Sequence, residues 1–133
     1  MTPSRRSAPV FRVIFHEAYL AEDLAQCSAE GRKVAQEARV ALERDGVAAD
    51  LLVPSHNEHR DGTSLAGMPH LYLPMPYGPW GVVLDAARDR DGLYLLATAF
   101  GLRHPDRRPS VYDVAHYRRH GRWPDGMRQT HRR

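Results

Sequence analysis

The sequence predicts an α+β domain: a small twisted antiparallel β-sheet with an N-terminal helical hairpin on one face and a short C-terminal helix. Between residues 16 and 46, apolar side chains recur at spacings of three and four, which is the period of a helix. Short apolar runs separated by turn-forming residues follow this segment, which is typical of successive strands. The order of strand, two helices, several strands and one helix favours helices packed against one small sheet.

The N-terminal half accounts for the hairpin. Residues 10–15 are almost continuously apolar, which predicts an inner strand buried on both faces. The helical pattern over residues 16–46 is interrupted at residues 28–31, so we expect either two helices or one helix with a break, arranged as an antiparallel hairpin. Residues 47–53 are expected to form a short edge strand. Residues 54–69, which are polar and rich in turn formers, are expected to form a long loop.

The C-terminal half supplies the rest of the sheet. Strands are predicted at residues 70–75, 80–87 and 93–100. Asp91-Gly92 separates the last two of these strands and is a strong hairpin signal. Ser110 is a favourable N-cap for a helix from Val111 to about Gly121.

The 133 residues fit one domain. We expect this domain over residues 10–121, with a flexible N-terminus over residues 1–9 and a basic C-terminal tail over residues 122–133. The single cysteine, Cys27, leaves no internal disulfide framework and fits a reducing compartment. No apolar run approaches the roughly 20 residues of a membrane span, and the N-terminus lacks the apolar core of a signal peptide. These features indicate a cytoplasmic protein.

Positive charge is concentrated in the last quarter of the chain. Residues 1–102 contain 10 Lys and Arg against 13 Asp and Glu, whereas residues 103–133 contain 9 Arg, 3 Asp and four histidines. Arginine binds phosphate through two parallel hydrogen bonds and stacks on bases. The distribution therefore indicates a polyanion or an acidic protein as partner. An arginine-rich coding bias would give the same composition.

Several short motifs occur in a fixed order over about residues 10–120. The motifs are Phe11-Arg12-Val13-Ile14-Phe15-His16-Glu17-Ala18, Leu71-Tyr72-Leu73-Pro74-Met75, Trp80-Gly81-Val82-Val83-Leu84, and Leu95-Leu96-Ala97-Thr98-Ala99-Phe100 with Arg103, Pro109, Ala115 and Arg118. The last block, which is the most specific, resembles a pattern found in the RelE/ParE toxin superfamily, and the whole order is most similar to its HigB or phage-Gp49-like branch.

The resemblance implies a toxin of a type II toxin–antitoxin system. Such a toxin acts as a metal-independent endoribonuclease or ribosome-dependent mRNA interferase and inhibits translation. The family also includes relatives that poison DNA gyrase, so this activity is the other one that the resemblance implies. It also implies a cognate antitoxin, commonly a helix-turn-helix protein, RNA and the ribosome as partners, and no cofactor. The chain departs from the pattern at Met75 and Gly81, where the family carries arginines. A non-catalytic protein-binding or nucleic-acid-binding module on the same fold is the alternative.

Cleavage by the RNA's own 2′-hydroxyl needs a base, an acid and cations near the phosphate. Histidine exchanges protons near neutral pH, so four histidines are the candidate catalytic residues. His56 and His59 lie in the long loop, where a solvated polar surface is the alternative interpretation. His70 begins the strand predicted at residues 70–75, and His104 lies in the basic segment after the last strand. His56 and His59 could supply only two zinc ligands, which are too few for a zinc site, so no metal is expected.

The candidate phosphate-binding or RNA-binding residues are basic or aromatic. Tyr72 shares a strand face with His70, because side chains alternate along a strand. Val111, Val114 and Ala115 are expected to face the sheet, which leaves Arg118 and Arg119 exposed on the closing helix. The candidates are Arg60, Tyr72, Arg103, Arg107, Arg108 and Arg118.

Overall fold

The computed structural model describes residues 8–56, 59, 61–125 and 127 and contains three helices and one five-stranded sheet, which confirms the α+β class. Most of the expected flexible N-terminus and part of the basic tail lie outside the described residues. In chain order the elements are β1 (Val10–Phe15), α1 (Glu17–Ala25), α2 (Ala29–Asp45), β2 (Val47–Ala48), the 3-10 turn Ala49–Leu51, β3 (His70–Leu73), β4 (Trp80–Asp89), β5 (Gly92–Leu102) and α3 (Val111–His120).

The strands are ordered β2-β1-β5-β4-β3, and one pairing differs from the expected antiparallel sheet. β1 pairs with β5 in parallel, with Arg12 opposite Tyr94 and Phe15 opposite Ala97. The β4–β5 hairpin leaves one edge of β5 free, and β1 fills that inner position. The expected burial of β1 on both faces is wrong, because Val13 and Phe15 are buried whereas Val10 is 61% and Ile14 38% exposed. A parallel pair needs a long connection, which the helices and the other strands provide. The prediction of a wholly antiparallel sheet is therefore wrong for this pair.

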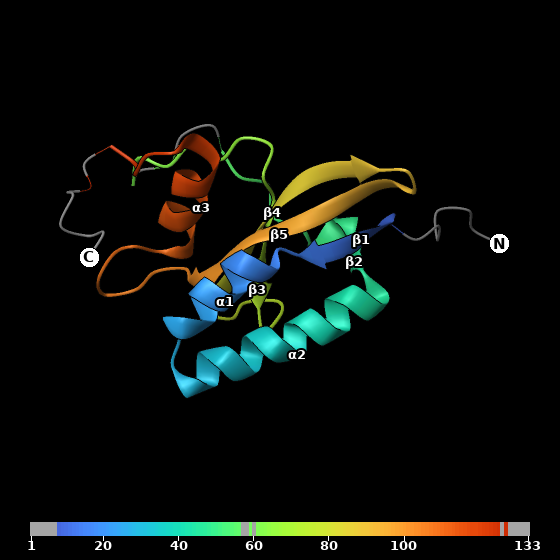
Figure 1. Cartoon of the computed structure of the whole chain (residues 1–133), viewed down its shortest axis with the longest axis horizontal. Helices are drawn as coiled ribbons and strands as arrows, with labels where there is room; N and C mark the ends of the chain where they lie inside the picture. Colours follow the sequence, from blue (N-terminus) through green and yellow to red (C-terminus); the bar gives the residue numbers. More distant parts are fainter. Residues whose placement is uncertain (1–7, 57–58, 60, 126, 128–133) are drawn as a thin grey trace.

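Helices cover both faces of the sheet, as Figure 1 shows for α2 and α3. On the face that α1 and α2 cover, the core includes Phe15, Leu84 and Leu95. On the opposite face, α3 and the segment before β3 bury a second cluster with Val83 and Ala115 at its centre. The predicted helical hairpin and C-terminal helix are thus confirmed, and they lie on opposite sides of the sheet.

Local sequence signals explain where the helices and the hairpin end. Ser28 accepts a hydrogen bond from the Gly31 backbone at 3.1 Å, so the interruption in the helical pattern is the N-cap of α2. Ser110 and Asp113 form a reciprocal capping box at the start of α3. Gly92 closes the β4–β5 hairpin with φ of +108°, a conformation that glycine adopts without strain.

Within the described residues, none of the helices is both long and apolar enough to cross a membrane.

Candidate functional site

Basic and aromatic side chains converge on the ring of Tyr112, at the start of α3. His70 approaches this ring edge-on, with 5.1 Å between ring centroids. The rings of His59 and His104 lie 6.2 and 6.3 Å from it. Arg103 donates a hydrogen bond from Nε to the Tyr112 hydroxyl at 3.3 Å. We call these five residues, with Tyr72 and His56, the Tyr112 cluster.

Arg103 is the fixed cation of this cluster. Its guanidinium carbon lies 3.8 Å above the centroid of the Tyr72 ring, and Nη1 donates to the Gly78 carbonyl at 3.0 Å. Its stem passes over Gly81, where an added Cβ would lie 2.9 Å from Arg103 Cγ. Glycine at position 81 therefore leaves the space in which the Arg103 side chain lies. The cation that the resemblance places at position 81 is absent, and Arg103 occupies the adjoining space instead.

His70 is held as a neutral imidazole with a defined tautomer. It is 5% exposed, and its Nδ1 lies 3.0 Å from the Ser55 hydroxyl oxygen. That hydroxyl donates its single proton to the Met68 carbonyl at 2.6 Å, so it accepts from the Nδ1–H of His70. Nε2 then carries the free lone pair. Burial, which is the largest cause, and the positive charge of the nearby Arg103 and of His59 and His56 together lower the pKa of His70 to about 4.

Tyr112 and the other histidines of the cluster differ in their burial and hydrogen bonding. Burial raises the pKa of Tyr112, although Arg103 opposes this, so the phenol keeps its proton at neutral pH and can donate it. His104 is exposed at the rim of the cluster. The His59 Nε2 atom is buried and has no hydrogen-bond partner in the described part of the chain. His56 is exposed, and its ring lies 5.6 Å from that of His59.

Four candidate catalytic histidines and two candidate RNA-binding residues, Tyr72 and Arg103, are thus brought together. Arg60 lies outside the described residues. Arg107 is exposed on the segment between β5 and α3. Arg108 forms an ion pair with Asp113, with Nε 2.9 Å from a carboxylate oxygen, and also donates to the Asp61 carbonyl at 2.9 Å. Most donors of Arg108 are therefore used within the fold.

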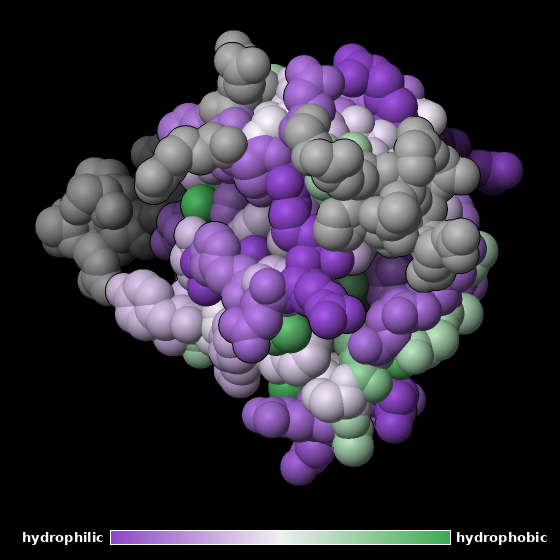
Figure 2. Space-filling model, turned by 90° about the vertical axis from the view of Figure 1, so that its left-hand side faces the viewer, coloured by the Kyte–Doolittle hydropathy of each residue, from purple (hydrophilic) through white to green (hydrophobic). Residues whose placement is uncertain are grey.

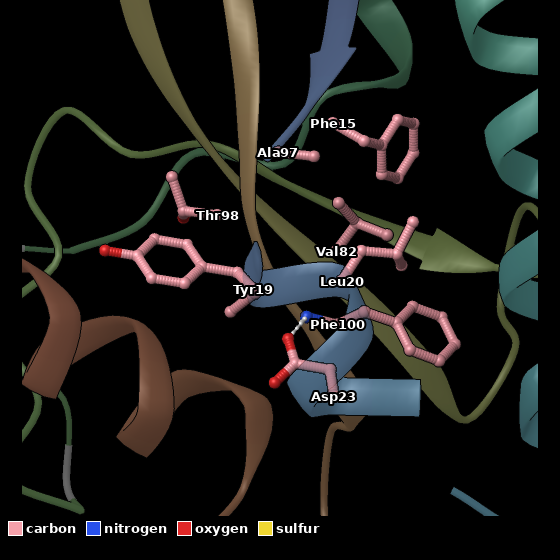
Figure 3. Close-up of a pocket in the computed structure, with 9 residues that line it drawn as sticks. Phe15, Tyr19, Leu20, Asp23, Val82, Ala97, Thr98 and Phe100 are labelled. Carbon is pink, nitrogen blue, oxygen red and sulfur yellow. Dashed lines mark hydrogen bonds between the residues drawn. The ribbon is translucent and has the colours of Figure 1, made fainter. Parts of the chain in front are cut away.

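Arg118 is also used within the fold, and the expectation that it is exposed is wrong. Its side chain is 10% exposed and donates to both carboxylate oxygens of Asp23 at 2.9 Å, to the Thr98 carbonyl at 2.7 Å and to Glu22 at 2.9 Å. Asp23 also accepts from the Phe100 backbone at 2.8 Å, as Figure 3 shows. Burial raises the pKa of Asp23 against the effect of Arg118. This side of α3 faces α1, so Arg118 joins the two helices to β5.

The cavity drawn in Figure 3, beside Asp23 and Phe100, is not a substrate site. Its volume is about 10 Å³, which holds about one water molecule at most.

One face of α3 fixes the segment that carries His59. The Nδ1 of His116 accepts from the Ser64 backbone N–H at 3.0 Å, and His120 Nε2 lies 2.9 Å from the Ser64 carbonyl oxygen. Arg119 donates to the Ala66 carbonyl at 2.7 Å.

Sequence reasoning missed Tyr112 and Ser55 as members of the site. Tyr112, His116 and His120 recur every fourth residue, so they share one helix face, and this spacing could have identified a polar face turned toward the long loop. No comparable signal marks Ser55.

Within the described ranges, no group of three His, Cys, Asp or Glu side chains is arranged to hold a metal ion. No protein-family model matches the chain, and searches of curated proteins and of solved structures found no significant match. The geometry of the Tyr112 cluster and the sequence resemblance are therefore the observations from which a function is proposed.

Proposed function

We propose that this protein is a toxin-type endoribonuclease that cleaves RNA through the attack of its 2′-hydroxyl, without a metal ion, and thereby inhibits translation. The observation that carries the proposal is the neutral His70 imidazole, whose Nε2 is unprotonated, beside the fixed Arg103 guanidinium and the Tyr112 hydroxyl. These groups supply a base, a cation and a hydrogen-bond donor in one place.

In the proposed reaction, Arg103 binds the scissile phosphate. His70 Nε2 takes the proton of the 2′-hydroxyl, the 2′-oxygen bonds to phosphorus, and the bond from phosphorus to the 5′-oxygen breaks. His104, which solvent reaches, gives a proton to the departing 5′-oxygen. Arg103 and the Tyr112 hydroxyl stabilise the charge that grows on the phosphate oxygens. The products are a 2′,3′-cyclic phosphate and a 5′-hydroxyl.

Substrate binding strengthens the base. The positive charge of Arg103 and of nearby histidines contributes to the low pKa of His70 in the free protein. An RNA phosphate brings negative charge next to that cation, which favours the protonated imidazole. The pKa of His70 therefore rises in the complex, and a base with a higher pKa removes a proton more readily.

The biological setting follows from the resemblance. A toxin of the RelE/ParE type acts in the cytoplasm on mRNA, at or near the ribosome, and is held inactive by an antitoxin encoded beside it. The basic last quarter of the chain supports a polyanionic target. A small helix-turn-helix protein encoded next to this chain would support the same assignment.

A non-catalytic RNA-binding or protein-binding module is the second candidate. It is favoured by the number of arginines that are already committed: Arg108 and Arg118 are ion-paired, and Arg103 uses Nε and Nη1 within the fold. Such a protein would hold a partner at the Tyr112 cluster without breaking a bond.

The chemistry of the RNA ends tests the proposal. The purified protein is incubated with free RNA in EDTA and, separately, with mRNA in a translation reaction, and the new ends are identified by mass spectrometry. We expect 2′,3′-cyclic or 3′-phosphate ends with 5′-hydroxyl ends. Ends with a 5′-phosphate, or cleavage of free RNA that EDTA abolishes and magnesium restores, would contradict the mechanism. Bound but intact RNA in both reactions would favour the second candidate.

A further inference from the structure

A second concave site lies between the end of α1, one face of α3 and the segment that joins β5 to α3. This groove has a volume of about 1070 Å³. Its wall includes Pro105 and Val111, which follow His104 and precede Tyr112 in the sequence. Figure 2 faces this side of the molecule and shows a largely hydrophilic surface with apolar residues set into it. The groove and the Tyr112 cluster thus adjoin each other along one connecting segment.

A stacked aromatic pair lines the groove. The rings of Tyr117 and Trp123 lie 4.7 Å apart at 24°, and Tyr117 is 41% exposed. The Trp123 ring therefore packs against one face of the Tyr117 ring, and the other face of the Tyr117 ring remains open to a ligand. The Trp123 Nε1 atom is buried and has no acceptor within the described residues. A buried donor without an acceptor is costly, so a ligand with an acceptor atom gains from binding beside it.

The groove also has a cation, Arg107, that forms no ion pair with the described carboxylates. Arg108 and Arg118 are paired with Asp113 and Asp23, which accounts for two of the three arginines along the wall. Arg107 is exposed, and no ion pair with a described carboxylate engages it. An open aromatic ring, an N–H donor and an arginine are the three groups that recognise a nucleotide by its base face, its base edge and its phosphate.

We infer that this groove binds a nucleotide of single-stranded RNA next to the cleaved bond, with its base stacked on Tyr117. The inference rests on the proposed function, since it extends the RNA strand beyond the Tyr112 cluster. Residues between Pro105 and Val111 line the groove, and His104 and Tyr112, which flank them in the sequence, belong to the Tyr112 cluster, so one strand can extend from one site to the other. The protein then prefers substrates longer than a dinucleotide.

Binding of short RNAs to Tyr117→Ala tests the inference. The probes are a 2′-O-methyl pentanucleotide of random sequence, which cannot be cleaved because its attacking hydroxyl is blocked, and a 2′-O-methyl dinucleotide. We expect Tyr117→Ala to weaken pentanucleotide binding by roughly 5- to 150-fold, the contribution of one stacked base, and to leave dinucleotide binding within about twofold. Tyr77→Ala is the matched control, because Tyr77 is 84% exposed and does not line the groove.

Trp123 provides a second readout. The pentanucleotide should quench tryptophan fluorescence more strongly in the parent protein than in Trp123→Phe, because Trp80, the other tryptophan that lines the groove, is only 7% exposed. If Tyr117→Ala lowers the melting temperature, Tyr117→Leu keeps an apolar side chain without a ring and should show the same loss of binding.

Two results would overturn the inference and separate it from the proposed function. If the parent protein cleaves RNA and both Tyr117 variants bind the pentanucleotide as tightly as the parent, the groove is not a nucleotide-binding site. The proposed function would remain in place. Equal weakening of dinucleotide and pentanucleotide binding would show that Tyr117 does not contact a flanking nucleotide. A parent protein that neither binds nor cleaves RNA would contradict both.

Discussion

The His70→Asn variant should cleave RNA about 100- to 10,000-fold more slowly than the parent protein, since this is the usual contribution of a general base. Asparagine keeps an N–H donor near the Ser55 hydroxyl, so the hydrogen bond that holds this position is retained. It lacks the free Nε2 lone pair that the proposed reaction needs. The measurement is the initial rate on one RNA substrate, with the melting temperature of both proteins determined on the same samples.

A substrate with sulfur in place of the 5′-oxygen separates the base from the acid. A thiolate leaves without a proton, so this substrate should restore most of the rate that His104→Ala loses. It should not restore the rate of His70→Asn, because the attacking hydroxyl still needs a base. Equal rescue of the two variants would contradict the roles assigned to these histidines.

Arg118→Met should lower the free energy of unfolding by about 3–5 kcal/mol, because it leaves the buried Asp23 carboxylate without its partner. Methionine keeps much of the apolar stem and removes all four donated hydrogen bonds of the guanidinium. Urea unfolding at neutral pH measures the change.

Arg119→Met is the matched control for this substitution. Arg119 is the next residue of α3, is exposed, and donates one hydrogen bond to the Ala66 carbonyl. Its replacement should cost no more than about 1 kcal/mol. If the two variants unfold at the same urea concentration, the Arg118–Asp23 pair does not contribute to stability in the way the contacts indicate.

Local signals in the sequence were sufficient for the helices and the β4–β5 hairpin. These signals are the helical period, the N-cap residues Ser28 and Ser110, and the Asp91-Gly92 turn. Each of them acts on residues only a few positions away in the chain, so it can be read from sequence alone. The parallel pairing of β1 with β5 could not be predicted in this way. It depends on which edge of the sheet is left free after the hairpin forms, and that is a property of the whole fold.

The candidate site was predictable by residue type and not by geometry. Histidines and arginines were chosen for their chemistry, and the fold brings His59, His70 and His104 around one ring. Arg118 has the same chemistry as Arg103, yet its partner Asp23 lies 95 residues earlier in the chain. Charge alone cannot show which arginine is neutralised by a distant carboxylate, because pairing is fixed only by tertiary structure.

The pH dependence of RNA cleavage by the parent protein tests the central claim most directly, since the claim is that a neutral His70 acts as the base. As pH falls, protonation of His70 removes the lone pair, so kcat/KM should fall through a pKa of about 4, the value for the free protein. The acid limb of kcat should lie at higher pH, because the bound phosphate raises the pKa of the imidazole. An acid limb of kcat/KM near pH 6.5, the ordinary pKa of histidine, or an absence of cleavage at every pH, would contradict the account.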